Sequence, residues 1–394
     1  MNRSTTRSFR PSLDRLEDRW CPSCSIRVLD GHILEIGGDD AGNRVIIAIE
    51  SQQSGEVRVI CDDDRAQMFH RIDSIKLRSG NGNDVVQFIV EDPDQRLSFR
   101  ADLGGGDDQF SAVLVQPGPC MPQDMPPRIA FDVMGGKGND TYDLFVGRAM
   151  AGSPTEAPPC LAAALDVKFD GGDGNDTFLT EWSHIAVTNP VTMDVDGGRG
   201  NDMIQVNCGS MSTGDALAPA DVIIANTWTG RFAGGGGNDN LISRLLPKVQ
   251  RGGMFVASFD GGGGNDTFIN FVRPAVEADA LCLVRYAGGR GNDLIVGATD
   301  PTVLGRGVCD LEFDGGPGND TINELLNLPT LTAGSDLNVV MKGEGGDDHL
   351  ALLTTGQPDP AAILNLTVDG GPGFDIATIA KIVQVTNCEQ VIVL

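Results

Sequence analysis

The sequence predicts an all-β fold, a parallel β-solenoid of the β-helix or β-roll type with about eleven coils and stacked Gly-rich turns. Three observations predict it. A short Gly- and Asp-rich phrase occurs eleven times, most copies stand about 27 residues apart, and apolar residues alternate on both sides of each copy. One solenoid coil fits this period, whereas a four-stranded propeller blade needs about 40–45 residues. We expect one elongated domain at residues 25–394, preceded by a targeting or cap segment at residues 1–24.

The repeated phrase reads Asp-Gly-Gly-x-Gly-Asn-Asp-x-apolar in its fullest form. The Gly before the Asn-Asp step is present in every copy, and the first Gly of the pair is replaced only by Ser79 and Leu103. Such dense glycine indicates turns with positive φ and close backbone approach. The final Asp of the eleven copies is Asp84, Asp108, Asp140, Asp176, Asp202, Asp239, Asp266, Asp293, Asp320, Asp348 and Asp375.

Both flanks of the turn have the pattern of strands. Apolar residues alternate before the Gly pair, as at Leu165, Val167 and Phe169, and the second residue after each final Asp is apolar in all eleven copies. Alternation with period two is typical of a strand that buries one face. Each coil is therefore expected to contain a strand, a Gly turn, a second strand and a return segment. The longest intervals hold Pro-rich insertions at 117–127, 152–159 and 209–219, which we expect to project on one side.

Composition limits the possible partners and compartments. The net charge of −26 argues against nucleic acid or an anionic membrane as a main partner, and no apolar run is long enough for a transmembrane helix. Nine irregularly spaced cysteines do not form a disulfide framework. Cys282 and Cys309 share one offset from their turns, so in-register stacking would place them together, either as a bridge or, as we favour, as small core residues.

The stacked Asp column is the candidate site. Carboxylates about 5 Å apart repel by about 3 kcal/mol at an effective ε near 20, so cations or local turn bonds must accompany them. Calcium takes six to eight oxygens, including backbone carbonyls. We favour calcium over purely structural Asn-Asp turn bonds for the well-formed copies, and leave both readings open at Asp84, Asp108, Asp348 and Asp375. The other proposed calcium ligands are Gly135, Gly138, Asp140, Gly171, Gly174, Asp176, Gly197, Gly200, Asp202, Gly234, Gly237, Asp239, Gly261, Gly264, Asp266, Gly288, Gly291, Asp293, Gly315, Gly318 and Asp320.

The copy at residues 170–178, Asp-Gly-Gly-Asp-Gly-Asn-Asp-Thr-Phe, resembles the haemolysin-type calcium-binding repeat of the repeats-in-toxin family. The resemblance implies that turn carbonyls and the Asp carboxylate share calcium with the next turn. That family usually places such nonapeptides back to back. This chain has one per coil, so only one edge of the solenoid is expected to hold ions of this kind.

A second resemblance lies at the N-terminus. Leu16-Glu17-Asp18-Arg19, followed by Pro22-Ser23, is similar to a short segment of large exported or surface proteins of planctomycete bacteria. Together the two resemblances imply a secreted or cell-surface bacterial protein that binds calcium and has a structural or adhesive role. Extracellular polysaccharide or surface components are further candidate partners.

Two alternatives stay open. One is a β-helix polysaccharide lyase or hydrolase, with Glu181, Arg231 or Arg251 near the insertions as candidate groups; the other is a secreted ligand-binding module that uses the insertion loops. No metalloprotease helix, hydrolase nucleophile elbow or phosphate-binding loop is present in the sequence, so we expect no enzyme.

Overall fold

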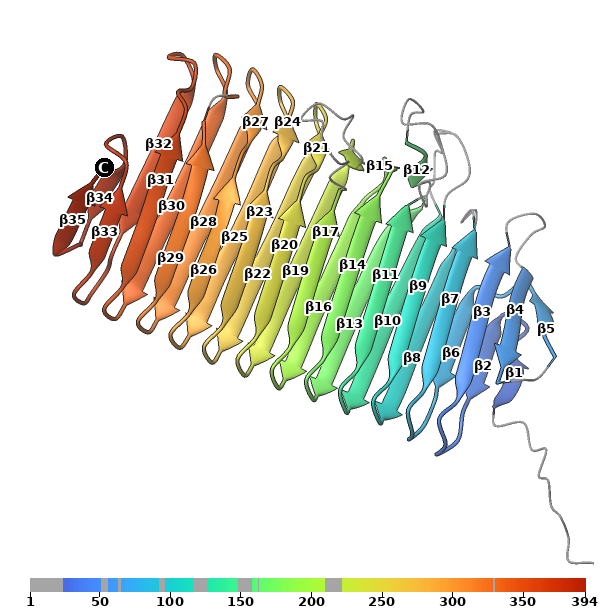
Figure 1. The fold of residues 1–394 in the computed structure, drawn as a ribbon. Helices are drawn as coiled ribbons and strands as arrows, with labels where there is room; N and C mark the ends of the chain where they lie inside the picture. Colours follow the sequence, from blue (N-terminus) through green and yellow to red (C-terminus); the bar gives the residue numbers. More distant parts are fainter. Residues whose placement is uncertain are drawn as a thin grey trace, which may run out of the picture.

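The computed structural model describes residues 24–50, 56–62, 65–91, 96–115, 127–147, 158–161, 163–209, 222–328 and 330–394. These residues form strands and connecting turns without a helix, so none of them builds an apolar helix that could cross a membrane. The strands stack into one long rod (Figure 1). The all-β parallel solenoid that the repeat predicts is confirmed.

Three sheets run along the rod. The first, sheet A, contains in spatial order β1 (Ser25–Leu29), β2 (Ile33–Gly37), β6 (Ser74–Arg78), β8 (Leu97–Gly105), β10 (Arg128–Lys137), β13 (Ala164–Asp173), β16 (Val191–Arg199), β19 (Thr227–Gly236), β22 (Met254–Gly263), β25 (Leu281–Arg290), β28 (Val308–Pro317), β30 (Asp336–Gly345), β32 (Ile363–Asp369) and β34 (Gln384–Thr386).

Sheet B contains the strands that follow the turns and, at its N-terminal end, two further strands that pair in antiparallel fashion. In spatial order they are β35 (Gln390–Val393), β33 (Ile376–Ile379), β31 (His349–Thr355), β29 (Thr321–Asn327), β26 (Leu294–Thr299), β23 (Thr267–Val272), β20 (Asn240–Leu245), β17 (Met203–Cys208), β14 (Thr177–Ser183), β11 (Thr141–Gly147), β9 (Gln109–Val115), β7 (Val85–Glu91), β3 (Arg44–Glu50), β4 (Glu56–Cys61) and β5 (Gln67–His70). The short sheet C lies in the return segments and contains β12 (Cys160–Leu161), β15 (Ile185–Val187), β18 (Val222–Ile224), β21 (Lys248–Val249), β24 (Ala275–Val276) and β27 (Thr302–Val303).

One coil runs from a strand of sheet A through the Gly turn to sheet B, and then through sheet C back to the next strand of sheet A. Neighbouring coils pair in parallel and in register: Phe255 of β22 pairs with Cys282 of β25, which pairs with Cys309 of β28. The flanking strands of successive turns also pair in register, as Thr267 with Leu294. The eleven turns therefore form one column along one edge of the rod, as predicted.

The core consists of the inward side chains of the alternating strands. The second residue after each final Asp is at most 1% exposed in all eleven copies. Aromatic rings also stack between coils, with centroid distances of 5.0 Å for Phe232–Phe259 and 5.1 Å for Phe259–Tyr286. Cys282 and Cys309 are stacked, buried and unbridged, which agrees with the favoured reading of them as small core residues.

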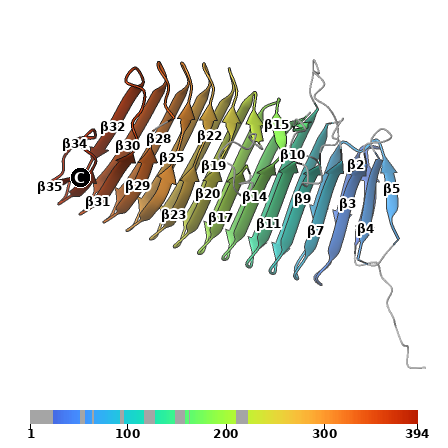
Figure 2. The same ribbon diagram turned by 45° about the horizontal axis from the view of Figure 1, so that its top comes forward.

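The two ends of the rod differ. At the N-terminal end β1 is antiparallel to β2, and β4 and β5 continue sheet B in antiparallel pairing (Figure 2). At the C-terminal end β34 pairs in parallel with β32 and β35 pairs in parallel with β33, and Val391 and Val393 are exposed because no further described coil covers them. The segment at residues 1–23, with its predicted targeting or cap role, and most of the three insertions lie outside the described residues.

Candidate functional site: the column of Gly-Asn-Asp turns

Glycine is required in the turn because each coil lies directly against the next. In the turn that ends at Asp266, Gly262 and Gly264 have φ of 96° and 138°, conformations that a side chain rarely adopts. A Cβ on Gly264 would lie 1.8 Å from the carbonyl oxygen of Gly237, and one on Gly262 would lie 2.1 Å from that of Gly235. The glycines therefore set the spacing between coils.

The Asp side chains form a ladder of hydrogen bonds along the column. The backbone N–H of Asp266 donates to Oδ1 of Asp293 in the next coil at 2.7 Å. The same bond joins all eleven Asp residues at 2.6–2.9 Å; Asn43 donates to Asp84 at one end and Asp375 donates to Glu389 at the other. One oxygen of each carboxylate thus has a structural role.

A second ladder uses the residue before the final Asp and runs in the opposite direction. The backbone N–H of Asn265 donates to Oδ1 of Asn238 in the preceding coil at 2.7 Å. Ten such bonds connect the turns from Asn83 to Phe374, with Asp107 and Asp347 taking the place of Asn. Each interior turn therefore donates the Asp N–H to the next turn and the Asn N–H to the preceding one, and it accepts the corresponding bonds from both neighbours.

The second carboxylate oxygen of every Asp in the ladder is buried without a hydrogen-bond partner. Oδ2 is in this state at Asp84, Asp108, Asp140, Asp176, Asp202, Asp239, Asp266, Asp293, Asp320, Asp348 and Asp375, and none of these residues is more than 3% exposed. Buried polar atoms normally have a partner, and a native chain leaves few of them unpaired. Eleven such oxygens lie in one file along the column.

Burial is the main physical cause of the raised pKa values in this column. Desolvation raises the pKa of Asp108, Asp176, Asp266 and Asp320 to about 7, against an ordinary value of 3.8, although the backbone N–H bond lowers it. The carboxylates of the adjacent coils raise these four values further. The pKa rises to about 6 at Asp140, Asp202 and Asp348, and it is also raised at Asp84, Asp239, Asp293 and Asp375.

The unpartnered oxygens point toward backbone carbonyls. The Cβ position of Gly261 lies 2.3 Å from Oδ2 of Asp266 and 2.4 Å from the carbonyl oxygen of Gly288 in the next coil. The same pair of oxygens, from one coil and the next, converges at Gly135, Gly171, Gly197, Gly288 and Gly343. Hard oxygen donors of this kind suit calcium. No group of three or more acidic, His or Cys side chains in the described part of the chain is placed to hold a metal, so carbonyls and water would complete any shell.

Not every predicted turn has the same interior. Leu103 and Ser79 place buried side chains where other coils have Gly, beside Asp108 and Asp84. In the coil of Asp140 the Tyr142 hydroxyl reaches the turn interior and donates to the Asp170 carbonyl at 3.2 Å. The turns from Asp176 to Asp375 have backbone alone at this first Gly position. Asp348 and Asp375, which the sequence left open, therefore resemble the well-formed copies in geometry.

The candidate groups for a polysaccharide-cleaving enzyme do not come together. Glu181 lies on β14 of sheet B, Arg231 on β19 of sheet A, and Arg251 follows β21 of sheet C. Arg231 forms an ion pair with Asp194 at 3.2 Å, and Arg251 forms one with Asp279 at 3.1 Å. These three residues do not build a shared site.

Two features were missed by sequence reasoning. Asn43 and Glu389 extend the ladder beyond the eleven copies. Asn43 belongs to a degenerate turn, formed by Gly37-Gly38 and Gly42, that lacks the final Asp. Glu324 lies inside the core, where it accepts hydrogen bonds from Thr299 at 2.6 Å and Asn270 at 3.1 Å, and burial raises its pKa to about 7. The sequence pattern could have located Glu324, because the alternation of inward and outward residues puts it on the inward face between Ile322 and Leu326.

The chain matches no protein-family model, no curated protein sequence and no solved structure.

Proposed function

We propose that this chain is an exported, calcium-stabilised repeat protein with a structural or adhesive role, and that calcium binds along the column of Gly turns. The observation that carries the proposal is the file of eleven buried Oδ2 atoms without hydrogen-bond partners. Calcium bound between consecutive turns would neutralise two adjacent carboxylates and give each of these oxygens a partner.

Protonation of the buried carboxylates is the alternative to calcium binding, and the two would act in different pH ranges. A raised pKa means that a buried carboxyl takes a proton at mildly acidic pH, but its ionised form dominates as the pH rises above about 7. At higher pH the column then carries unpaired buried charge, which is costly. A divalent cation removes this cost under the conditions in which protons cannot.

The location outside the cytoplasm has support of a different kind. Cys160 is disulfide-bonded, and disulfides persist mainly in oxidising compartments. Extracellular calcium modules bind with affinities of about 10⁻⁴–10⁻³ M, a range that extracellular calcium can saturate. A rod that becomes rigid where calcium is abundant suits a structural or adhesive role at a cell surface.

The test is a calcium titration of the full chain, followed by circular dichroism and thermal melting at pH 8, starting in chelator. We expect a cooperative rise in melting temperature with a midpoint of about 10⁻⁴–10⁻³ M, and a smaller rise with magnesium, which demands stricter geometry. Asp266→Asn should weaken the calcium response. Asp30→Asn, which removes the same charge from an exposed turn, should leave it unchanged. An identical melting temperature in chelator and in millimolar calcium contradicts the proposal.

A further inference from the structure

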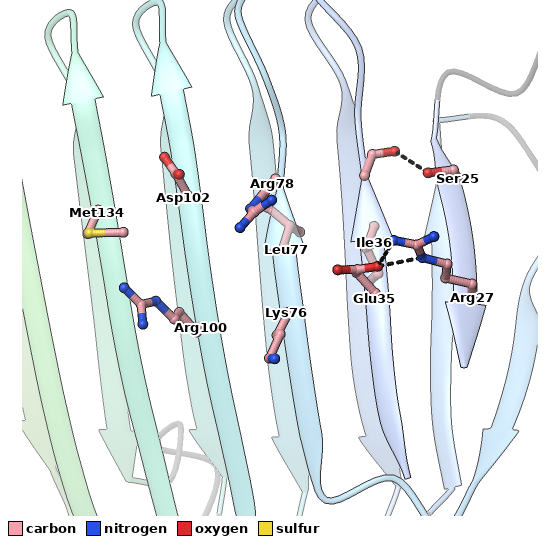
Figure 3. Close-up of a pocket in the computed structure, with 11 residues that line it drawn as sticks. Ser25, Arg27, Glu35, Ile36, Lys76, Leu77, Arg78, Arg100, Asp102 and Met134 are labelled. Carbon is pink, nitrogen blue, oxygen red and sulfur yellow. Dashed lines mark hydrogen bonds and ion pairs between the residues drawn. The ribbon is translucent and has the colours of Figure 1, made fainter. Parts of the chain in front are cut away.

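A basic pocket lies on the outer face of sheet A near the N-terminal end, where it borders the turns of the first coils at Gly37, Arg78 and Asp102. Its volume is about 580 Å³, and its lining includes Arg27, Glu35, Lys76, Arg78 and Arg100. Figure 3 shows Lys76 and Arg78 on β6 and Arg100 on β8, with the Arg100 side chain directed toward the strand of Met134 and with Arg27 and Glu35 joined at the β1 side. Four cations and the two carboxylates of Glu35 and Asp102 line the pocket, in a chain whose net charge is −26.

Two like charges are paired directly in this pocket. Lys76 is in register with Arg100 on the neighbouring strand, and Arg78 follows two residues after Lys76 on the same face. Paired strands lie about 4.8 Å apart, and alternate residues of a strand about 6.7 Å apart, so three cations occupy one small area. Like charges directly opposite each other destabilise a sheet.

The rest of the same cross-strand row avoids this arrangement. Beyond Arg100, the row continues with Asp132, Lys168, Asp194 and Arg231, in which each charge faces its opposite. Arg231 and Asp194 form an ion pair at 3.2 Å. Lys76 and Arg78 form no ion pair with any residue in the described ranges, whereas Arg100 forms one with Asp132 at 3.6 Å. Lys76 and Arg78 each lie in register with one carboxylate, Glu35 and Asp102, but the four cations of the pocket still outnumber its two carboxylates.

We propose that this pocket binds an oxyanion, namely the carboxylate, sulfate or phosphate group of a small molecule or of a glycan end. The Arg78 and Arg100 guanidinium groups offer planar pairs of donors that fit such a group, and the Lys76 ammonium adds a point charge. A long polyanion does not suit the site, because it would run past Asp102, Asp132 and Asp166 on the adjoining coils. The ligand is a short one with a single anionic group at the pocket.

The test is calorimetric titration of the full chain at low ionic strength with three probes: inorganic sulfate, glucuronate and the neutral sugar glucose. We expect sulfate and glucuronate to bind and glucose not to bind. Equal affinity for the two anions identifies a general oxyanion pocket, whereas tighter binding of glucuronate identifies a sugar acid as the source of the group. Absence of binding for both anions overturns the proposal.

Variants locate the site. Lys76→Gln and Arg78→Gln should each weaken anion binding about tenfold or more, since a hydrogen bond to a charged group contributes about 1.5–3 kcal/mol. Lys168→Gln is the matched control, because Lys168 lies in the same row between two carboxylates, and it should leave binding unchanged. Equal weakening by Lys168→Gln overturns the proposal, because the effect would then be one of overall charge. Melting temperatures without anion show that each variant is folded.

The pocket and the calcium column are separable. Anion binding is measured both in chelator and in saturating calcium, and Lys76→Gln should keep the full calcium response of the melting temperature. If calcium has no effect but the anions still bind, only the calcium proposal is wrong. If calcium stabilises the chain and the anions do not bind, only the pocket proposal is wrong.

Discussion

Adjacent glycines in one turn differ in backbone conformation and in the space available for a side chain. Gly262 has φ of 96° and faces the Gly235 carbonyl, whereas Gly263 lacks a positive φ and has no atom within 4 Å of a Cβ position. Glu344 stands at the position equivalent to Gly262 in its coil, with φ of 66°. One strained residue is therefore tolerated in the column.

Gly262→Ala should destabilise the protein by about 1–3 kcal/mol, the usual cost of forcing a side chain into this region of φ, with an added cost from the carbonyl contact. Gly263→Ala should change stability by less than about 0.5 kcal/mol, because a Cβ there would meet no atom within 4 Å. Chemical denaturation of both variants measures the difference. Equal effects at the two positions would show that glycine is not selected by this contact.

At the scale of the element, each coil adds a buried carboxyl whose pKa is raised. A folded-state pKa above the unfolded value stabilises the fold through proton binding. That stabilisation is fully present below the unfolded pKa near 3.8 and is lost as the pH rises through 6–7. The interval from pH 5 to 8 therefore spans the range in which these buried carboxyls and Glu324 lose their protons.

In chelator, the melting temperature should fall as the pH rises from 5 to 8, and calcium should reduce this fall. Asp266→Asn keeps an oxygen for the Asp239 N–H and places an amide donor beside the Gly288 carbonyl. It should therefore raise the melting temperature in chelator at pH 8 and reduce the pH dependence. A melting temperature that rises with pH in chelator would contradict the raised pKa values.

Much of the coil could be predicted from the sequence, because period two, the Gly turn and the fixed offset of Asp are local signals. The inward side chains, the column of turns and the stacking of Cys282 on Cys309 follow from them. The use of Oδ1 as a ladder acceptor and the burial of Oδ2 could not be predicted, since both depend on the direction in which each Asp turns toward the next coil. Glu389 was missed because it carries out the ladder's role without the Gly phrase.

At the scale of the whole molecule, the strands of each coil pair only with those of the adjacent coils, so the position of a destabilising substitution matters. Stability in such arrays is close to a sum of coil and interface terms. Asp266 lies in the middle of the regular run, and Asp375 lies one turn from the C-terminal end of the ladder.

Asp266→Ala removes the acceptor for Asp239 and leaves a buried N–H unpaired, so it should destabilise by about 1–3 kcal/mol. Asp375→Ala removes the acceptor for Asp348 but affects only the last coils, so its global effect should be smaller. Hydrogen exchange should show loss of protection on both sides of residue 266 in the first variant, and only near the C-terminus in the second. Equal global effects would indicate that the rod unfolds as a single unit.

The opposite directions of the two ladders have a consequence for how such a chain changes over evolution. Every interior turn presents the same donor and acceptor to its neighbours, so a coil can be duplicated or lost without creating a mismatched joint. Length is then free to vary, and the residues that end the ladders decide where the array stops. Phe374 supplies an N–H but no side-chain oxygen to the Asn ladder, and Glu389 closes the Asp ladder.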